Sequence, residues 1–319
     1  MPDTRYVRLS RELFLTAFGD ELGGIEPWVT DRLTSLLEEE EVGAGDTLFS
    51  AGDPPHFFYF LRSGTVKLVR DGSAPWTLEG PHVFGMFEAL LDRPRTRTAL
   101  VVGDSQLMKV GSDAWIELLE ESFELSRTAT FSAARWVALL EENLLAHGIS
   151  PRPTAFRTPR VPAGRLDILE RLALLMGTPL LRGAGVQPLS DLALVSEEAH
   201  FDPGATLMTR GTPRDRLFMV LEGEVQASCQ RPGVVRTAGP GDFVCGAAAF
   251  GERAPAWEAS ATTSTRALAF GVEDWFDLME EHFELVRSVL AGMALERERL
   301  LDLLALYEKT VVVNPWGRP

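Results

Sequence analysis

Cysteine and long hydrophobic runs are scarce in this sequence. Its two cysteines, Cys229 and Cys245, exclude a disulfide framework and a four-cysteine zinc site. The longest apolar-looking stretch runs from Leu172 to Leu181, and the first residues include Asp3, Arg5 and Arg8 without an apolar segment. A membrane span needs roughly 18 apolar residues, so we expect a cytoplasmic protein that does not enter a membrane.

Basic residues are outnumbered in this chain. Asp and Glu total 46 against 31 for Lys and Arg, which gives a formal net charge of −15. Such a field repels polyanions, so we expect neither DNA nor an anionic membrane as a partner. Three of the basic residues are lysines, at positions 67, 109 and 309, and this preference for arginine suggests a bacterium with a GC-rich genome.

The remaining composition is typical of a folded protein. Hydrophobic residues make up 45% and charged residues 24% of the chain, close to the globular average. A length of 319 residues corresponds to about two domains. We therefore expect two folded domains rather than a disordered chain or a fibre.

The sequence contains an internal repeat. The segment that begins at Gly45 reads GDTLFSAGDPPHFFYFLRSGTV, and the segment that begins at Gly204 reads GATLMTRGTPRDRLFMVLEGEV. Three pairs of glycines keep one and the same spacing: Gly45 with Gly204, Gly52 with Gly211 and Gly64 with Gly223. Downstream, WIELLEESFEL from Trp115 recurs as WFDLMEEHFEL from Trp275, at a spacing that is larger by a single position. So small a drift indicates a nearly gap-free duplication.

Each copy consists of short strands with helices before and after them. The strand-like runs 57–61 and 66–69 flank Ser63-Gly64, which predicts a β-hairpin, and Glu222-Gly223 predicts the same hairpin in the second copy. The spacing of apolar residues predicts a helix over 27–37, with Trp28, Val29, Leu33, Leu36 and Leu37 on one face. Ser112 or Asp113 is expected to cap a helix that begins near Trp115.

A proline-rich segment separates the two copies. The stretch from Ile149 to Gly164 holds four prolines and has no hydrophobic periodicity, which is typical of a linker. The predicted division is a first domain over 1–148, a linker over 149–164 and a second domain over 165–319.

The order of these elements resembles the cyclic nucleotide-binding domain family, which has the fold of catabolite activator protein and of protein kinase A regulatory subunits. The resemblance covers about residues 28–147 and 188–306. It implies an α+β fold with two tandem antiparallel β jelly rolls, each flanked by N- and C-terminal helices. It also implies a phosphate-binding cassette, in which helix-start N–H groups and an arginine hold the cyclic phosphate and a glutamate accepts the ribose 2′-hydroxyl.

In the first copy the cassette reads FGMFEALLDRPRTRTA from Phe84. Gly85 matches the cassette glycine and Arg95 the phosphate-binding arginine, and Thr96 places a hydroxyl beside it. Met86 occupies the glutamate position, and Glu88 is too far along the helix turn to replace it. If the segment is an extended strand, Arg95 and Arg97 point to the same side and form a doubled cation; the alternative is that Arg97 pairs with Glu88 or Asp92 on the surface. The candidate ligand-binding residues of the first domain are Gly85, Met86, Glu88, Arg95, Thr96 and Arg97.

The second copy has lost both polar anchors of the cassette. Gly246 keeps the glycine, but Ala247 stands at the glutamate position and Ala256 at the arginine position. A cyclic phosphate would find no counter-charge there, so we expect this degenerate second domain not to bind cyclic nucleotides.

The sequence shows no sign of an enzyme. The five histidines lack metal-ligand spacing, and neither a G-x-S-x-G motif nor a phosphate-binding loop occurs. Because thirteen residues follow Leu306, we expect no helix-turn-helix of the kind that the family's transcription factors carry. We expect no catalytic residue, no metal and no cofactor, apart from a cyclic nucleotide or another anionic ligand in the first domain.

The resemblance also bears on assembly, because family dimers pair their terminal helices. The two terminal helices are predicted over 127–147 and 286–307, and their apolar stripe consists of Val137, Leu140, Leu144, Leu290, Met293, Leu300 and Leu304, with Arg297 interrupting the second helix. The stripes predict an internal pseudo-dimer or a homo-oligomer through these helices; alternatively, each helix folds back on its own barrel.

Two classes of function remain open. The first is a regulatory adaptor, impaired in cAMP and cGMP binding, that uses both domains to bind a protein partner. The second is a sensor that binds a nucleotide or another anionic ligand in the first domain through Arg95.

Overall fold

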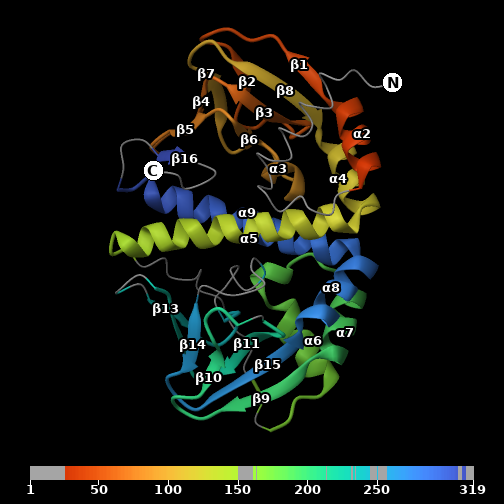
Figure 1. Ribbon diagram of the computed structural model, residues 1–319, viewed down its shortest axis with the longest axis vertical. Coiled ribbons are helices and arrows are strands. Elements are labelled where there is room, and N and C mark those ends of the chain that lie inside the picture. Colours follow the sequence, from red (N-terminus) through yellow and green to blue (C-terminus); the bar gives the residue numbers. More distant parts are fainter. Residues whose placement is uncertain are drawn as a thin grey trace. The chain divides into compact units, whose positions relative to one another are not determined.

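The computed structural model describes residues 26–149, 161–162, 164–212, 214–230, 233, 235–244, 250, 257–307 and 311–313. The helices are α2 (Pro27–Leu36), α3 (Phe87–Leu90), α4 (Ser112–Glu121), α5 (Phe123–Ala146), α6 (Ile168–Met176), η2 (Pro179–Leu181), α7 (Val186–Val195), α8 (Val272–Glu281) and α9 (Phe283–Leu304) (Figure 1). The strands of the first copy and the C-terminal strand are β1 (Glu38–Glu40), β2 (Thr47–Phe49), β3 (Phe57–Ser63), β4 (Thr65–Val69), β5 (Trp76–Glu79), β6 (His82–Phe84), β7 (Thr98–Val101), β8 (Gln106–Gly111) and β16 (Val311–Val313). Those of the second copy are β9 (Glu197–Phe201), β10 (Thr206–Met208), β11 (Arg216–Glu222), β12 (Val225–Ser228), β13 (Val235–Ala238), β14 (Glu258–Ala261) and β15 (Thr265–Gly271).

The chain divides into two compact units. The first comprises Met1–Ser132 together with Arg297–Pro319, and the second comprises Ala133–Glu296. Both divisions fall inside a long helix, α5 or α9. Each unit is therefore built from one set of strands and the last turns of the helix that follows the other set.

The first unit is formed by two sheets. One has the strand order β1-β8-β3-β6, and the other has the order β16-β5-β4-β7-β2. The pairs are antiparallel except that β16 runs parallel to β5, with Val311 opposite Trp76. Strand β3 lies inside its sheet, and its apolar residues from Phe58 to Leu61 are buried. Helix α4 covers this core through Trp115, whose ring meets that of Phe58 edge-on at 5.5 Å.

The second unit repeats the arrangement. Its sheets have the orders β10-β14-β12-β13 and β11-β15-β9, and all of their pairs are antiparallel. Trp275 of α8 takes the place of Trp115 and contacts the rings of Phe243, Phe250 and Phe270. The predicted α+β fold of two tandem jelly rolls with flanking helices is thus confirmed.

The hairpin predicted at Ser63-Gly64 is wrong. Strands β3 and β4, which this turn joins, belong to different sheets, and so do β11 and β12 around Gly223. The turn is a corner at which the chain leaves one sheet for the other. Gly64 has a φ of +101°, and the backbone there lies directly against Asp104 and Ser105.

The helices begin and end close to the predicted positions, with two differences. The residue before α4 is Gly111, and neither Ser112 nor Asp113 caps the helix; the N-cap makes no side-chain hydrogen bond. In α2, Val29 and Leu33 are buried as predicted, but Trp28 is 40% exposed. Its indole N–H donates to Glu26 at 2.6 Å instead of entering the core.

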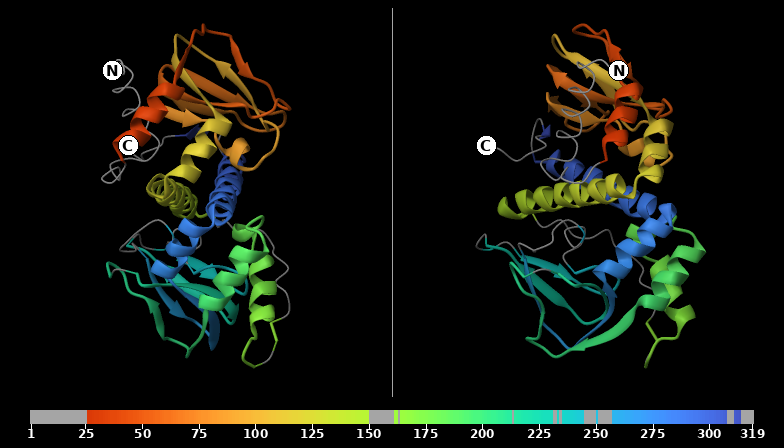
Figure 2. Two further views of the ribbon diagram at one scale, coloured as in Figure 1. Left: turned by 90° about the vertical axis from the view of Figure 1, so that its right-hand side faces the viewer. Right: turned by 45° about the vertical axis from the view of Figure 1, so that its right-hand side comes forward.

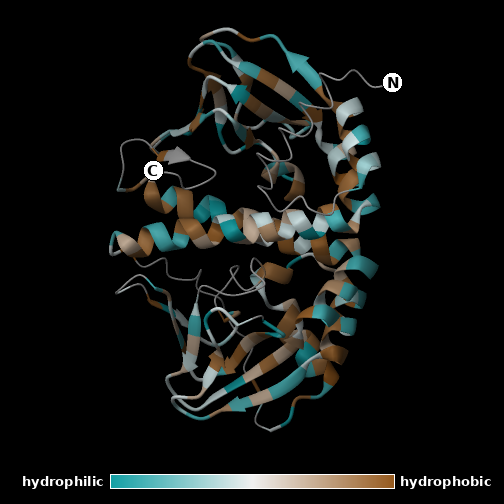
Figure 3. Cartoon of the chain, in the orientation of Figure 1, coloured by the Kyte–Doolittle hydropathy of each residue, from teal (hydrophilic) through white to brown (hydrophobic). Residues whose placement is uncertain are grey.

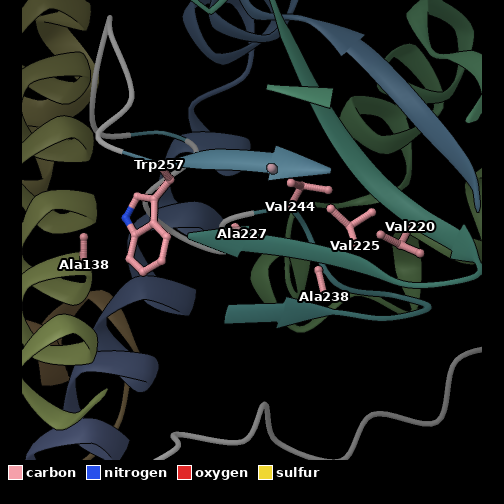
Figure 4. Packing of buried hydrophobic residues seen from close by; sticks show 8 residues of the cluster. Ala138, Val220, Val225, Ala227, Ala238, Val244 and Trp257 are labelled. Carbon is pink, nitrogen blue, oxygen red and sulfur yellow. The ribbon is translucent and has the colours of Figure 1, made fainter. Parts of the chain in front are cut away.

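The last turns of α5 complete the second unit (Figure 4). Ala138 of α5 lies in one apolar cluster with Trp257, Ala227 and Val244 of the second barrel. Glu141, one turn further along α5, accepts a hydrogen bond from Arg236 of β13. Hydrophobic and hydrophilic stretches alternate along both long helices (Figure 3), as a helix with an apolar face requires.

These contacts bear on two of the predictions. The repeat-based division into 1–148, 149–164 and 165–319 stays a prediction about the sequence; the packing units differ from it because the ends of α5 and α9 pack on the strands of the other copy. The expectation that each helix folds back on its own barrel is therefore wrong for the last turns of α5 and α9.

Pairing of the two helices with each other stays a prediction. Most of the predicted linker lies outside the described residues.

Within the part of the chain that the structure describes, no helix has the length and apolar character needed to cross a membrane.

The corner at Gly64 provides a test of this fold. An alanine Cβ at position 64 would lie 2.6 Å from the carbonyl oxygen of Asp104, whereas at Gly45, with a similar φ of +96°, it would meet nothing within 4 Å. Both positions disfavour L-residues by about 1–2 kcal/mol, and only the first adds a clash with backbone. We expect Gly64→Ala to lower the free energy of unfolding by about 3 kcal/mol and the control Gly45→Ala by about 1 kcal/mol in urea titrations. Equal losses would contradict the corner.

Candidate functional site

The first cassette is a short loop and helix between β6 and β7. Gly85 follows β6 with a φ of +83°, and Met86 precedes α3 at its N-cap position. After α3 the chain turns through Asp92, whose φ is +48°. Residues 96 and 97 then form a bend before β7 begins at Thr98.

Arg95 points into the first barrel. Its guanidinium donates hydrogen bonds to the carbonyl oxygens of Gly85 and Phe57, and to Glu88 at 3.3 Å. The guanidinium carbon lies 4.2 Å from the centre of the Phe49 ring, and the side chain is 2% exposed. A Cβ at position 85 would come within 3.0 Å of this guanidinium, so Gly85 is needed both for its backbone conformation and for the close approach of Arg95.

Arg97 points to a different place. Its guanidinium carbon lies 3.7 Å from the centre of the Trp76 ring, and it donates a hydrogen bond to Asp302 of α9 and a long one of 3.4 Å to Ser73. The other carboxylate oxygen of Asp302 accepts from Arg70 at 2.7 Å. The predicted strand and doubled cation are therefore wrong, because the bend at 96–97 directs the two arginines to separate partners.

A second carboxylate of α9 binds the same loop. Glu298 accepts hydrogen bonds from Arg93 and, at 3.1 Å, from the hydroxyl of Thr96. Arg297 lies 4.7 Å from the ring centre of Phe87 in α3. The left view of Figure 2 shows the last turns of α9 beside α3. The expectation that Arg97 pairs with Glu88 or Asp92 is wrong, since Glu88 pairs with Arg95 and Arg97 with Asp302.

The second unit contains an equivalent of the Arg97 cluster with its residue types exchanged. At the repeat spacing that relates Trp115 to Trp275, Trp257 corresponds to Arg97 and Arg236 corresponds to Trp76. Arg236 lies 4.3 Å from the Trp257 ring centre and donates to Glu141 of α5. We call each of these groups an Arg–Trp–carboxylate clasp: Arg97, Trp76 and Asp302 in the first unit, and Arg236, Trp257 and Glu141 in the second.

The cassette residues of this site were predicted from the sequence, but their partners outside the cassette were not. The sequence interpretation named Arg95, Glu88, Thr96 and Arg97, each of which makes a polar contact in the cassette or its surroundings. The degenerate second-domain residues Gly246, Ala247 and Ala256 lie outside the described residues. It did not identify Arg70, Trp76, Glu298 or Asp302. The spacing of four between Glu298 and Asp302, which places both carboxylates on one helix face, was the available signal.

Burial sets the electrostatics around the cassette. Desolvation lowers the pKa of Arg95 and of Arg97, and their carboxylate partners act in the opposite direction. Burial lowers the pKa of Arg297 to about 10. His82 of β6 is fully buried, and desolvation together with the nearby charge of Arg297 lowers its pKa to about 3. Among the described residues, no group of His, Cys, Asp and Glu could hold a metal ion.

The low pKa of His82 predicts a pH dependence of stability. Between about pH 6.5, where an unfolded histidine titrates, and pH 3, the unfolded chain binds one more proton at His82 than the folded chain. The contribution of His82 is therefore complete above pH 6.5 and falls as the pH is lowered, by up to about 1.4 kcal/mol per pH unit. We expect the slope of unfolding free energy against pH to flatten in His82→Gln and to stay unchanged in His147→Gln, an exposed control. Parallel slopes for all three proteins would refute this assignment.

Two groups of curated proteins are similar to part of this chain. The chain is 26% identical over 98 residues to a cAMP-dependent protein kinase regulatory subunit of Hypocrea atroviridis, which covers 31% of this chain and 21% of the relative. It is 29% identical over 126 residues to a CRP-like cAMP-activated global transcriptional regulator of Mycobacterium tuberculosis, covering 38% of this chain and 56% of the relative. The chain thus spans less than two thirds of either relative.

Solved structures show a distant similarity over almost the whole chain. The regulatory domain of Toxoplasma gondii protein kinase A, solved with cAMP, is 17% identical with a TM-score of 0.35, covering 93% of this chain and 98% of that one. The regulatory subunit of a cAMP-independent protein kinase A from Trypanosoma brucei is 14% identical with a TM-score of 0.38, covering 96% and 90%.

The family model of the cyclic nucleotide-binding domain matches residues 39–122 and 198–282. These two matches coincide with the two sets of strands and together cover more than half of the sequence. The chain belongs to the cyclic nucleotide-binding domain family and contains two tandem copies of that domain.

Proposed function

We propose that this protein is a non-enzymatic regulatory adaptor whose two cyclic nucleotide-binding domains work without binding cAMP or cGMP. The observation that carries the proposal is the position of Arg95. Its guanidinium, the group expected to hold the cyclic phosphate, is already bonded to Gly85, Phe57 and Glu88 inside the barrel.

A cyclic phosphate would have to compete with these internal partners. Two of them are backbone carbonyl groups, which cannot move away without disturbing β3 or the cassette turn. Leaving such buried acceptors without a donor costs about 1–3 kcal/mol each. Binding through Arg95 is therefore opposed by the loss of bonds that the domain already has.

The ribose side of the cassette also lacks its acceptor. Met86 occupies the glutamate position, and Glu88, the next acidic residue, is paired with Arg95 at 3.3 Å. A ribose hydroxyl would have no free carboxylate at this position. The loss of that hydrogen bond adds about 1–3 kcal/mol to the penalty.

The two clasps support a role that does not depend on a ligand. A domain that reports ligand binding through its terminal helix needs that helix to be able to move. Here Asp302 of α9 is bonded to the first barrel and Glu141 of α5 to the second. Helix ends held in this way suit a scaffold, and we propose that its partner is another protein rather than DNA or a membrane.

The remaining parts of the proposal rest on the sequence. The acidic charge, the arginine bias and the absence of a catalytic motif favour a non-enzymatic protein of the bacterial cytoplasm that needs no cofactor. The terminal helices would pair as an internal pseudo-dimer or in a homo-oligomer.

A second candidate function, an anion sensor, is favoured by Arg97. Its side chain is 2% exposed, yet Nε and one terminal nitrogen have no hydrogen-bond partner among the described residues. Buried N–H groups of this kind are suited to bind an oxyanion or ordered water. Arg95 has one such nitrogen, Nε, against two in Arg97, and the terminal nitrogens of Arg95 are bonded inside the barrel. A sensor would therefore use Arg97 rather than Arg95.

Calorimetry on the full chain tests the main proposal. Titration with cAMP and with cGMP is expected to show no binding tighter than about 100 μM, because Arg95 is engaged and Met86 offers no acceptor. Met86→Glu should tighten any residual binding, and Met86→Leu serves as the control of similar size. Submicromolar affinity of the unchanged chain for either nucleotide would overturn the proposal.

A further inference from the structure

Further polar residues surround the clasp of the first unit. Arg70 joins Arg97 on Asp302, and Arg93 binds Glu298 one turn earlier on α9. At the repeat spacing that relates Gly64 to Gly223, the position equivalent to Arg70 in the second copy is Cys229. Duplication alone therefore does not account for Arg70 in the first unit.

Glu298 and Asp302 of α9 each accept two hydrogen bonds from residues of the first copy. Each of the four oxygens of Glu298 and Asp302 accepts one hydrogen bond, from Arg93, Thr96, Arg97 and Arg70. Two carboxylates placed four residues apart on a helix present their oxygens side by side. Such an array fills the positions that the oxygens of a phosphate would take between guanidinium groups.

The charges in this cluster do not cancel. Three arginines face two carboxylates, which leaves one positive charge in a chain with a net charge of −15. Arg97 also keeps two buried nitrogens without a hydrogen-bond partner among the described residues. A phosphate dianion carries the same charge as Glu298 and Asp302 together, and it offers acceptor oxygens to the Arg97 nitrogens that these carboxylates leave without a hydrogen bond.

We propose that Arg70, Arg93 and Arg97 form an oxyanion-binding site. In the unliganded protein the carboxylates of Glu298 and Asp302 occupy this site. The ligand class is a phosphate dianion, free or carried as a monoester, and it binds by displacing the last turns of α9. This inference rests on the second candidate function, the anion sensor, and names the site, the ligand class and the movement of α9 that such a sensor would use. The site lies at Arg97 and not at Arg95, which remains inside the barrel.

Removal of the two carboxylates should open the site. The variant Glu298→Gln/Asp302→Asn keeps the shape of both side chains and removes their charge. In calorimetry with inorganic phosphate on the full chain, we expect it to bind at least about tenfold more tightly than the unchanged protein. Adding Arg97→Gln should abolish the gain.

Two control variants distinguish this site from a general charge effect. Glu284→Gln removes an exposed charge from the first turn of α9, and Glu141→Gln opens the equivalent clasp of the second unit. Neither should increase phosphate binding. An equal gain in either control, or no gain in a folded double variant, would overturn the proposal; comparison of AMP, a phosphate monoester, with inorganic phosphate then distinguishes a monoester from the free ion.

A measurement on the unchanged protein covers the case in which the double variant does not fold. Hydrogen exchange of residues 297–304 is expected to accelerate in about 50 mM phosphate relative to chloride at matched ionic strength. Unaltered exchange would contradict displacement of α9. Tight cAMP binding by the unchanged chain would contradict the proposed function without affecting this result, so the two proposals fail separately.

Discussion

Buried guanidinium groups must be given partners, and this requirement organises the first unit. Arg95 and Arg97 are each 2% exposed at the side chain, where an unpaired charge would cost several kcal/mol. Arg95 obtains its partners from the barrel itself. Arg97 obtains Asp302, which lies 205 residues further along the chain. The last turns of α9 therefore belong to the first unit, together with β16, which extends the sheet at β5.

The second unit meets the same constraint with the residue types exchanged. Trp76 and Arg236 occupy equivalent positions opposite the neighbouring strand, Trp76 across from Leu68 and Arg236 across from Ala227. Arg97 and Trp257 directly precede the equivalent strands β7 and β14. The cation–π contact between arginine and tryptophan can form whichever of the two positions holds the arginine. A carboxylate is needed in both cases to pair with the guanidinium. Both units thus contain the clasp, with the arginine and the tryptophan at exchanged positions.

Sequence reasoning succeeded where the signal was local or repeated. The constant spacing between the paired glycines established two copies, and the alternation of strands, turns and helices established their fold. It failed at Gly64 because the choice between a hairpin and a corner depends on which distant strands each neighbour pairs with. It failed at Ser112 because a good capping residue does not decide where a helix begins when the backbone of Gly111 takes that position.

The candidate site shows the same limit. Gly85 and Arg95 could be identified from the motif, but the motif could not reveal that the guanidinium turns inward onto Phe57, a residue of another strand. Nor could it reveal the partner of Arg97, because a contact over 205 residues depends on the packing of the whole unit. Glu298 and Asp302 have the helical spacing of paired ligands, yet nothing in the local sequence indicates which surface they meet.

The coupling between Arg97 and Asp302 is the most direct test of whether buried arginines hold α9 in the first unit. A double-mutant cycle with Arg97→Gln and Asp302→Asn, measured as free energy of unfolding, isolates their interaction from the effect of each substitution alone. Because Arg97 is buried and Asp302 is partly exposed, we expect a coupling of about 1–3 kcal/mol. Additive effects, within about 0.5 kcal/mol, would show that α9 is not held by this pair.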